Sequence, residues 1–293
     1  MKENINYKIV TANPEIINEF TNTFAYLKKK VNPIGALIAV NINNEIIGRI
    51  IYEIKPVPAP LEGFDWFIDN LRVIPELRHT GIGSALLRNL IELAEESDVG
   101  NFVGSCTNTT AHKFWDKHKF CFLTYGQRID NIDNPEEHGN FPHLFFYRIK
   151  KSPCDKIDAK HTVTQVTQNE FDILFEKHIM IEKHAYFHDK KDDFICLSIT
   201  GEQQNYVFAY EYDMGTPLFG KQLIILHTVN TLVESSVKSI ITFAKEKGYK
   251  QLTCRYLDDE AVKFWHENDF NMCVHYISYL ENGNHPVSAA IRL

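Results

Sequence analysis

The sequence predicts an α+β protein in which one order of strands and helices occurs twice. Short apolar runs of strand length alternate with amphipathic runs whose apolar residues recur at helical spacing. The segment Ala111-His-Lys-Phe-Trp-Asp-Lys-His-Lys-Phe120 recurs as Ala261-Val-Lys-Phe-Trp-His-Glu-Asn-Asp-Phe270, at an offset of 150 positions. The first copy is centred on the stretch from Val73 to Ser84, which contains two glycines and joins an apolar run to an amphipathic one.

The composition limits the classes of protein to which this chain can belong. The 293 residues are enough for two ordinary domains or one large one, and 44% hydrophobic with 24% charged residues is typical of soluble globular proteins. The net charge of −7 gives no reason to expect nucleic acid or an anionic membrane as a partner. The six cysteines form no Cys-x-x-Cys pair, which argues against a disulfide framework or structural zinc. Without an apolar leader or long apolar run, we expect a cytoplasmic protein.

The first half carries signals for ten elements. Asn13 before Pro14 marks a helix start, because asparagine caps a helix and proline suits its first position. Asn43-Asn44 separates two apolar runs and favours a hairpin, since asparagine tolerates positive φ. The expected strands span residues 7–11, 35–42, 45–54, 64–73, 101–106, 120–129 and 143–149, and the expected helices span residues 14–27, 84–97 and 111–118.

The second half shows the same order when the offset is carried along the chain. The expected strands span residues 162–166, 194–200, 205–213 and 251–256, and the expected helices span residues 169–188 and 234–247. Residues 261–270 match residues 111–120. The polar, proline-containing segment Lys150-Lys-Ser-Pro153-Cys-Asp155 is typical of a linker. We therefore expect two domains, residues 1–152 and 153–293, of which the second is a diverged copy of the first.

The glycine-containing stretch predicts an anion site. A strand that turns through glycines into a helix presents unpaired N–H groups and the positive end of the helix dipole at one point. No lysine follows Gly83, which excludes a Walker-type loop, and Leu86 stands where a dinucleotide fingerprint needs its third glycine. The remaining pattern is Arg78-x-x-Gly81-x-Gly83. A plain strand–helix turn with a surface arginine is the alternative interpretation.

This pattern, preceded by Leu71-x-Val73, resembles the acetyl-CoA pyrophosphate loop of the GNAT superfamily, the GCN5-related N-acetyltransferases, whose pattern is Arg/Gln-x-x-Gly-x-Gly/Ala. The element order over residues 5–150 is also similar to a GNAT domain. The resemblance implies tandem acyl-CoA N-acyltransferase folds, each a mixed, largely antiparallel sheet flanked by helices. It also implies acetyl-CoA as cosubstrate. The residues that it assigns to the cofactor are Leu71, Val73, Arg78, His79, Thr80, Gly81, Ile82, Gly83, Ser84, Asn108 and Trp115.

The resemblance also assigns chemical roles. Backbone N–H groups at Leu71 and Val73 would hold the acetyl carbonyl and the pantetheine arm, and Asn108 would contact that arm or cap the helix after it. Asp69 is a tentative base. By strand alternation it shares a face with Phe67, Leu71 and Val73, so burial would raise its pKa. The alternative is that Asp69-Asn70 only satisfies a bulge in this strand.

The expected acid departs from the family pattern. Family members commonly carry Asn-x-x-Ala-x-x-Phe-Tyr-x-x-x-Gly-Phe, whereas here Trp115 replaces the tyrosine and Lys119 the glycine. An indole N–H donates a hydrogen bond but is not a useful proton donor at neutral pH. The thiolate therefore leaves without a dedicated acid, or His118 or Tyr125 serves. The recurrence of Phe-Trp in the second copy favours packing as the main role of Trp115.

The second copy lacks the loop chemistry. The counterpart of the Arg78–Gly83 pattern is Thr228-Val-Asn-Thr-Leu-Val233, which has no arginine and no glycine. β-Branched side chains there would block close approach to a pyrophosphate. We therefore expect CoA binding to be confined to the first half.

Two polar features suggest partners only weakly. His184 and His188 share a helical face, but no motif supplies an acidic third ligand, so we expect no metal. The loop from Asp130 to Asn140 contains four acids and no lysine or arginine. It would border the acceptor site and could attract a cationic amine, although a plain solvated loop is the alternative.

These observations lead to one main expectation and two alternatives. We expect an acetyl-CoA-dependent N-acetyltransferase in which a primary amine attacks the thioester directly, with no covalent enzyme intermediate. A non-catalytic acyl-CoA-binding module or sensor is the first alternative, and an interaction scaffold is the second. As partners we expect an amine-bearing acceptor, no nucleic acid and no membrane, in a monomer or homodimer.

Overall fold

The structure of the chain is a computed structural model. The described chain falls into two compact units, one of residues 1–106 with 142–150 and one of residues 107–141 with 151–293. None of the helices in the described ranges combines the length and hydrophobicity that a membrane-spanning helix needs. The structure describes residues 6–57, 61, 63–97, 99–106, 109–124, 143–149, 161–178, 194–201, 204–213, 221–257, 259–274 and 287–293.

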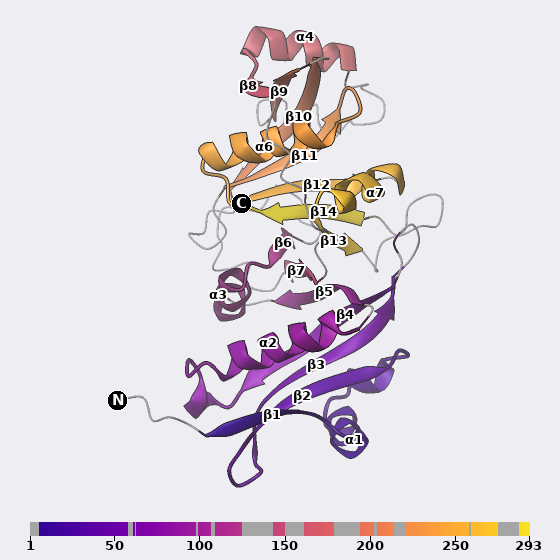
Figure 1. Cartoon of the computed structure of the whole chain (residues 1–293), viewed down its shortest axis with the longest axis vertical. Coiled ribbons are helices and arrows are strands. Elements are labelled where there is room, and N and C mark those ends of the chain that lie inside the picture. Colours follow the sequence, from indigo (N-terminus) through magenta and orange to yellow (C-terminus); the bar gives the residue numbers. More distant parts are fainter. Residues whose placement is uncertain are drawn as a thin grey trace. The chain divides into compact units, whose positions relative to one another are not determined.

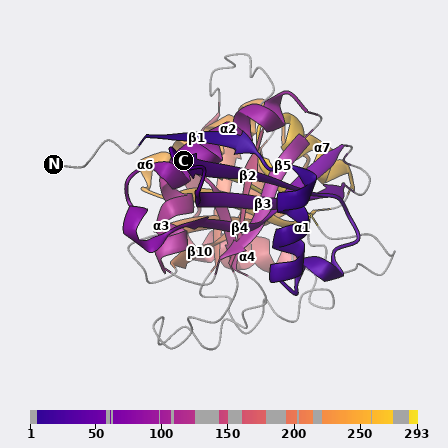
Figure 2. The same cartoon turned by 90° about the horizontal axis from the view of Figure 1, so that it is seen from below.

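The first sheet has seven strands in the order β1-β2-β3-β4-β5-β7-β6. Neighbouring strands from β1 to β4 are antiparallel, β4 and β5 are parallel, and β5 and β7 are antiparallel. Figure 2 shows β1 to β4 side by side in this order. The strand bounds are β1 Tyr7–Thr11, β2 Ile34–Asn41, β3 Ile46–Pro56, β4 Phe64–Val73, β5 Val99–Cys106, β6 Cys121–Thr124 and β7 His143–Arg148.

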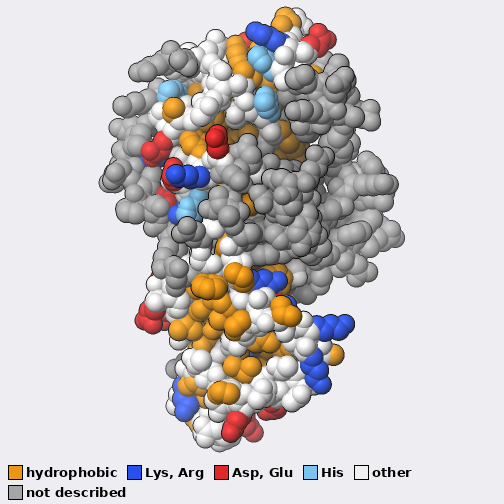
Figure 3. All heavy atoms as spheres, turned by 90° about the vertical axis from the view of Figure 1, so that its right-hand side faces the viewer, with side chains coloured by type: hydrophobic (Ala, Val, Ile, Leu, Met, Phe, Trp, Pro, Cys, Tyr) orange, Lys and Arg blue, Asp and Glu red, His pale blue; other side chains and the backbone are white. Residues whose placement is uncertain are grey.

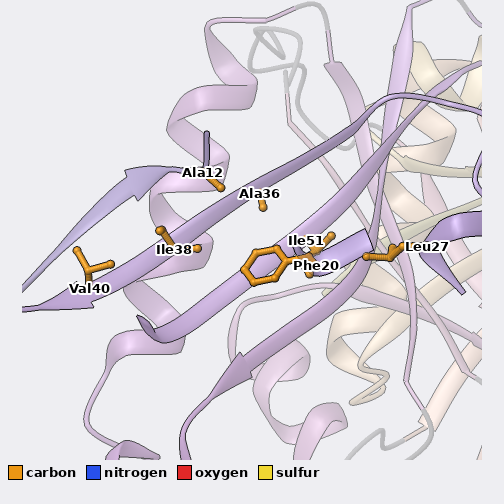
Figure 4. Close-up of a cluster of buried hydrophobic side chains, with 7 residues drawn as sticks. All are labelled: Ala12, Phe20, Leu27, Ala36, Ile38, Val40 and Ile51. Carbon is orange, nitrogen blue, oxygen red and sulfur yellow. The ribbon is translucent and has the colours of Figure 1, made fainter. Parts of the chain in front are cut away.

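Helices cover both faces of the sheet in the first unit (Figure 1). On one face, α1 (Pro14–Thr23) begins where the Asn13 side chain accepts a 2.9 Å hydrogen bond from the N–H of Ile16. Its apolar side packs into a core that includes a short 3-10 turn, η1 (Leu27–Lys29). Figure 4 shows this core, whose buried members are Ala12, Phe20, Leu27, Ala36, Ile38, Val40 and Ile51.

On the other face lies α2 (Ile82–Glu95), which buries one apolar stripe. The helix comes so close to β3 that a Cβ on Gly48 would lie 3.1 Å from Ile82 and 3.2 Å from Leu86. Because α1 and α2 lie on opposite faces, the side chains of each strand alternate between two different environments.

A β-bulge interrupts β4. Ile68 pairs with Tyr52 and Asn70 pairs with Ile51, which leaves Asp69 as the extra residue. The parallel pairing of β4 with β5 ends one residue before the bulge, at Ile68 and Gly104. Within the described residues the two strands therefore separate at Asp69.

The second sheet repeats the first, in the order β13-β14-β12-β11-β10-β9-β8. In it β11 pairs antiparallel with β10 and parallel with β12, as β4 does with β3 and β5. The expected tandem α+β arrangement of two mixed sheets flanked by helices is confirmed. The bounds are α3 Thr109–Lys117, β8 Thr162–Gln165, α4 Gln168–His178, β9 Phe194–Thr200, β10 Asn205–Asp213, β11 Lys221–Thr228, α6 Glu234–Glu246, β12 Gln251–Leu257, α7 Asp259–Glu267, β13 Asn271–Val274 and β14 Val287–Arg292.

The repeat extends to the irregularity in the central strand. In β11, Phe208 pairs with His227 and Ala209 with Ile225, so Leu226 is an extra residue like Asp69 in β4. The parallel pairing with β12 again ends one residue before the bulge, at Ile225 and Cys254. Both copies therefore separate their central strands at the same structural position.

Several expected bounds differ from those observed. The first helix ends at Thr23 because Phe24 takes an extended backbone conformation, and Leu27 lies in η1. Of the expected strand 120–129 and helix 169–188, the structure describes Cys121–Thr124 and Gln168–His178. The expected linker at 150–155 lies outside the described residues. The domain boundary after residue 152 stays a prediction, while α3 and β6 group with the second unit.

One buried side chain anchors β6 within the second unit. The Gln251 amide is fully buried, accepts a 3.0 Å hydrogen bond from the N–H of Phe122 and donates a 2.9 Å bond to its carbonyl. It also donates to the Thr253 hydroxyl at 2.8 Å. A buried backbone group that loses its partner keeps the full cost of desolvation. The residues that follow α3 in the chain are thus fixed by a side chain from β12.

We expect Gln251→Met to lower the free energy of unfolding by about 2–4 kcal/mol, since methionine fits the volume but leaves the N–H and C=O of Phe122 unsatisfied. Urea denaturation followed by circular dichroism measures the change. Gln168→Met, at an exposed position of α4, is the matched control and should shift the free energy of unfolding by less than about 0.5 kcal/mol. Equal midpoints for the two variants would contradict the anchoring role of Gln251.

Candidate active site

The N-terminus of α2 carries no capping group. Gly81 is the N-cap residue, no side chain accepts a hydrogen bond there, and the first turn contains no acidic residue. The first N–H groups of any helix have no partner within the helix and lie at the positive end of its dipole. By contrast, the Asn13 side chain and Glu15 occupy the start of α1. The start of α2 is therefore available to an anion.

The loop before α2 is shaped by its own hydrogen bonds. A 3-10 turn, η2 (Pro75–Leu77), follows β4, and the Thr80 hydroxyl donates a 2.6 Å bond to the carbonyl of Leu77. Gly81 has φ of 101°, a left-handed conformation that disfavours any side chain. Apart from its chain neighbours, no described residue has an atom within 4 Å of where a Cβ on Gly81 would stand. The backbone at Gly81 can therefore be approached closely.

The remaining predicted loop residues lie at the same corner. Arg78 is exposed and its Nε lies 3.4 Å from the carbonyl of Val73, while His79 has a left-handed φ of 63°. Ile82, the first residue of α2, is buried, and Gly83 and Ser84 in the same turn are partly buried. The structure thus brings the predicted residues 78–84 together at one helix end.

Leu71 and Val73 lie in the part of β4 beyond the bulge. Both side chains are partly buried, and the described parallel pairing with β5 has already ended at Ile68. On that side, the strand edge leads from the bulge towards the loop at α2. It is a continuous backbone edge of the kind that hydrogen-bonds extended ligands.

The register corrects one expectation about Asp69. Phe67 pairs with Glu53 and Leu71 pairs with Ile50, so Phe67 and Leu71 point to opposite faces of the sheet. The bulge inserts one residue and thereby reverses the alternation. Asp69 therefore does not share a face with Leu71 and Val73, and its side chain reaches the same ion pair as Glu53.

The Asp69 carboxyl group is buried in a network of charges. Its side chain is 8% exposed, and Oδ1 lies 3.0 Å from Nζ of Lys30. The same ammonium lies 2.6 Å from the buried Glu53, which also accepts a 2.7 Å bond from Asn32 and lies 3.7 Å from Lys55. Oδ2 of Asp69 is buried and makes no hydrogen bond within the described part of the chain. One oxygen is thus held and the other is open.

The balance between burial and neighbouring charges shifts the pKa values of the two carboxyl groups in opposite directions. Burial raises the pKa of Asp69, the charge of Glu53 adds to the rise, and Lys30 and Lys55 only partly oppose it. At Glu53, burial also raises the pKa, but the bonds from Lys30 and Asn32 outweigh it and the pKa is lowered. The pKa of Lys30 is raised because its bonds to Glu53 and Asp69 outweigh burial. Asp69 is therefore the better proton acceptor.

The equivalent positions in the second unit differ chemically. The apolar Leu226 occupies the bulge position. The connection to the helix spans residues 229–233, shorter than residues 74–81, so Thr228 ends the strand and is not a loop residue as the constant offset implied. Asn205 accepts from the N–H of Asn230 at 3.1 Å and donates to its carbonyl at 3.0 Å. Glu234 stands in the first turn of α6 and would repel an anion.

Other predicted residues lie elsewhere or outside the described residues. Trp115 is 5% exposed in the second unit and its ring packs 4.8 Å from that of Phe120, as Trp265 packs 4.7 Å from Phe270. This packing accounts for the recurrence, and a cofactor role for Trp115 stays a prediction. The His118 ring packs 4.7 Å from that of Phe114. The residues outside the described part are Asn108, Tyr125, the loop 130–140, His184 and His188.

Sequence reasoning missed Lys30, Glu53 and Arg49. Nothing local distinguishes Lys30 from Lys28 and Lys29, and Glu53 alternates with apolar residues like any solvent-facing strand residue. A buried Glu53 follows only from the pairing of β3 with β4 under η1. Within the described residues, no group of three or more His, Cys, Asp or Glu is placed to hold a metal.

Comparison with known proteins gives one family model and several solved structures. Residues 9–120 match the model described as the acetyltransferase (GNAT) family. Arabidopsis thaliana NAA60 in complex with acetyl-CoA is 18% identical over 49% of this chain and 99% of that chain, with a TM-score of 0.36. A GNAT-family acetyltransferase from Staphylococcus aureus Mu50 is 14% identical over 50% and 100%, with a TM-score of 0.35. A transcriptional regulator from Bacillus halodurans is 20% identical over 40% and 93%, with a TM-score of 0.32. No curated protein matches the chain.

We expect Asp69→Asn to raise the free energy of unfolding at pH 7. In the unfolded chain the carboxyl group ionises near an ordinary pKa of about 3.9. Because the folded state raises this pKa, stability falls as the pH rises from that value through the raised pKa, and asparagine removes this loss. Urea denaturation at pH 7 and below pH 4 measures the difference, which should vanish at the lower pH.

Glu53→Gln is the matched control with the opposite sign. The folded pKa of Glu53 is lowered, so its ionised form stabilises the protein at neutral pH and this contribution is lost as the pH falls. The substitution should therefore destabilise at pH 7 and less so in acid. If both variants shift stability in the same direction at pH 7, the described charge network is wrong.

Proposed function

We propose that this chain transfers an acetyl group from acetyl-CoA to a primary amine, with CoA bound in the first unit, since residues 9–120 match the acetyltransferase (GNAT) family model. The observation that carries the proposal is the uncapped start of α2, which follows the part of β4 that no longer pairs with β5. The buried carboxyl group of Asp69 stands at the point where that pairing ends. The family model supports the acyltransferase class, and the geometry supports the assignment of roles.

The α2 corner fits a pyrophosphate. Its helix start offers N–H donors and the dipole, with no acidic side chain in the first turn. The left-handed Gly81 leaves open the space that a Cβ would take, so phosphate oxygens can reach the backbone. Arg78 supplies an exposed cation at the same corner. We assign the pyrophosphate to the amides of residues 79–84.

The strand edge beyond the bulge fits the pantetheine arm and the acyl carbonyl. Leu71 and Val73 lie on the edge that β5 has left, between Asp69 and the α2 loop. Backbone N–H groups that are fixed in advance stabilise a developing oxyanion more than water does, since they need no reorganisation. We assign the N–H of Leu71 to the acetyl oxygen.

Acetyl-CoA supplies the activated acyl group, and Asp69 performs the proton transfer. An acceptor arrives as an ammonium and must lose a proton before its nitrogen can attack. Among the residues that the structure describes, none hydrogen-bonds to the buried Oδ2 of Asp69, and Lys30 holds Oδ1 so that the carboxylate cannot turn away. Asp69 takes the ammonium proton, directly or through water, before the neutral nitrogen attacks. As the C–N bond forms and the C–S bond breaks, the second nitrogen proton passes to solvent and the sulfur leaves as thiolate.

A non-catalytic acyl-CoA-binding module is the second candidate. Trp115 in place of the family tyrosine favours it, because no tyrosine stands at that position to reprotonate the thiolate. The buried Asp69 opposes it, since a binding module gains nothing from a carboxylate whose pKa is raised by burial. Amine-dependent release of CoA separates the two candidates.

We expect Gly81→Val to lower kcat/KM for acetyl-CoA by at least about 100-fold, because a left-handed β-branched residue distorts the amides assigned to the phosphates. A thiol assay of CoA release with an amine panel measures this change. Gly248→Val is the control, since Gly248 also has a positive φ of 78° and open space around its Cβ. It should lower stability similarly and leave KM for acetyl-CoA unchanged. Full activity of Gly81→Val would remove the proposed CoA site.

We expect Asp69→Asn to lower kcat/KM for the amine by about 100- to 10,000-fold at neutral pH. The pH profiles of two neighbours test the mechanism more sharply. Lys30→Met removes the cation that lowers the pKa of Asp69, so the acid limb of kcat/KM should move to higher pH, and Lys30→Arg should restore it. Glu53→Gln removes the anion that raises this pKa, so the limb should move to lower pH. Shifts in one common direction would exclude Asp69 as the base.

A further inference from the structure

Two arginines face each other across β3 and β4. Arg49 and Arg72 are register partners, so both side chains leave the sheet on the same face. The Arg49 Nε lies 3.2 Å from Oδ1 of Asn70, and its guanidinium lies 4.7 Å from the centre of the Phe24 ring and 5.4 Å from that of Phe20. The aromatic rings and Asn70 thus fix the plane of the Arg49 guanidinium.

No described carboxylate neutralises this pair. Neither arginine forms an ion pair within the described residues. Burial lowers the pKa of Arg49, the charge of Arg72 lowers it further, and among the described groups Tyr26 acts in the opposite sense. Like charges directly opposite each other destabilise a sheet. A half-buried, fixed arginine beside a second arginine is an arrangement that an anionic ligand would stabilise.

The pair lies on the same face as the buried carboxylate. Tyr26 lies in the electrostatic field of both groups of charges. Burial and the charge of Asp69 raise its pKa, and Arg49 and Lys30 only partly oppose this rise. Along the strand, the Cα atoms of Asp69 and Arg72 are about 10 Å apart at the usual rise of an extended chain. Exposed hydrophobic surface from Tyr26 and Val31 flanks Lys30. Figure 3 shows one face of this unit, in its lower part, where hydrophobic side chains gather with Lys and Arg side chains nearby.

The anion that fits here is not the pyrophosphate assigned to α2. Gly48 faces α2, since a Cβ there would meet Ile82 and Leu86. The next residue, Arg49, leaves the opposite face, where Phe20 of α1 lies under its guanidinium. The arginine pair and the start of α2 therefore lie on different faces of the sheet. An anion at the pair must belong to the other substrate.

We propose that Arg49 and Arg72 bind a carboxylate of the acyl acceptor, so that the acceptor is an amine that also carries a carboxylate, as amino acids do. This proposal rests on the function proposed above, because it takes Asp69 as the group that receives the amine. The acceptor then spans from Asp69 to the arginine pair. The planar guanidinium of Arg49 can donate two hydrogen bonds to the carboxylate oxygens, and Arg72 adds the second positive charge.

The turnover test uses matched acceptors. Amino acids of increasing length are compared with their carboxamides in the CoA-release assay, for wild-type protein and for Arg49→Gln, Arg49→Lys and Arg72→Gln. Wild-type protein should prefer the carboxylate of the best pair by about 10- to 100-fold in kcat/KM. Both glutamine variants should lower this preference towards unity, and Arg49→Lys should retain part of it. Arg88→Gln, at an exposed position of α2, is the control and should retain the full preference for the carboxylate. An unchanged preference in both glutamine variants, or none in wild type, overturns the proposal.

A binding test separates the two proposals. Calorimetric titration with the N-acetyl derivative of the best amino acid, or of glycine when none turns over, is compared with its carboxamide. The affinity of the carboxylate compound for wild-type protein should exceed its affinity for Arg72→Gln by about 10-fold or more. Arg72 is chosen because its side chain is exposed and supports no packing. Equal binding overturns the anion site. Carboxylate binding that is lost in Arg72→Gln, without turnover of any amine, refutes the enzymatic function and leaves the anion site in place.

Discussion

The end of parallel pairing between β4 and β5 is the constraint on which the candidate site depends. Pairing stops at Ile68 and Gly104, and the bulge at Asp69 follows at once. Because the extra residue increases the local twist, β4 leaves its neighbour and exposes a backbone edge inside an otherwise continuous sheet. That edge points to the start of α2, where Gly81 opens the backbone. One irregularity therefore provides both the buried carboxylate and the backbone edge proposed to bind the ligand.

The same bulge places Asp69 in a network that no single residue explains. Lys30 lies between Glu53 and Asp69. Burial raises the pKa of both carboxyl groups, but the net shifts are opposite because Glu53 receives more of the hydrogen bonds. A pair of carboxylates with separated pKa values is the usual way to keep one as a proton acceptor. The cost is a buried charge, which is consistent with a site kept for chemistry rather than for stability.

The two copies show which parts of this fold carry chemistry. Sheet order, bulge position and the end of parallel pairing are repeated in the second unit. Leu226 stands at the bulge position that Asp69 has in the first unit, and the connection from strand to helix is shorter. The Asn205 side chain hydrogen-bonds to the N–H and the carbonyl of Asn230. Since the scaffold persists where the polar groups have changed, the scaffold alone does not make the site. The glycine loop and Asp69 distinguish the first unit.

The sequence by itself determined the repeat, the tandem α+β fold and the loop of residues 78–84, because these depend on local periodicity and on glycine conformation. It also identified Asp69 as a candidate from its position before the loop. Only the tertiary structure decided that the bulge turns Leu71 to the other face, that Lys30 bridges Asp69 and Glu53, and that Arg49 and Arg72 are paired on the same face. Glu53, Arg49 and Arg72 lie on strands that are paired across about 20 residues of chain, and Lys30 follows η1. Local sequence carries no information about such register.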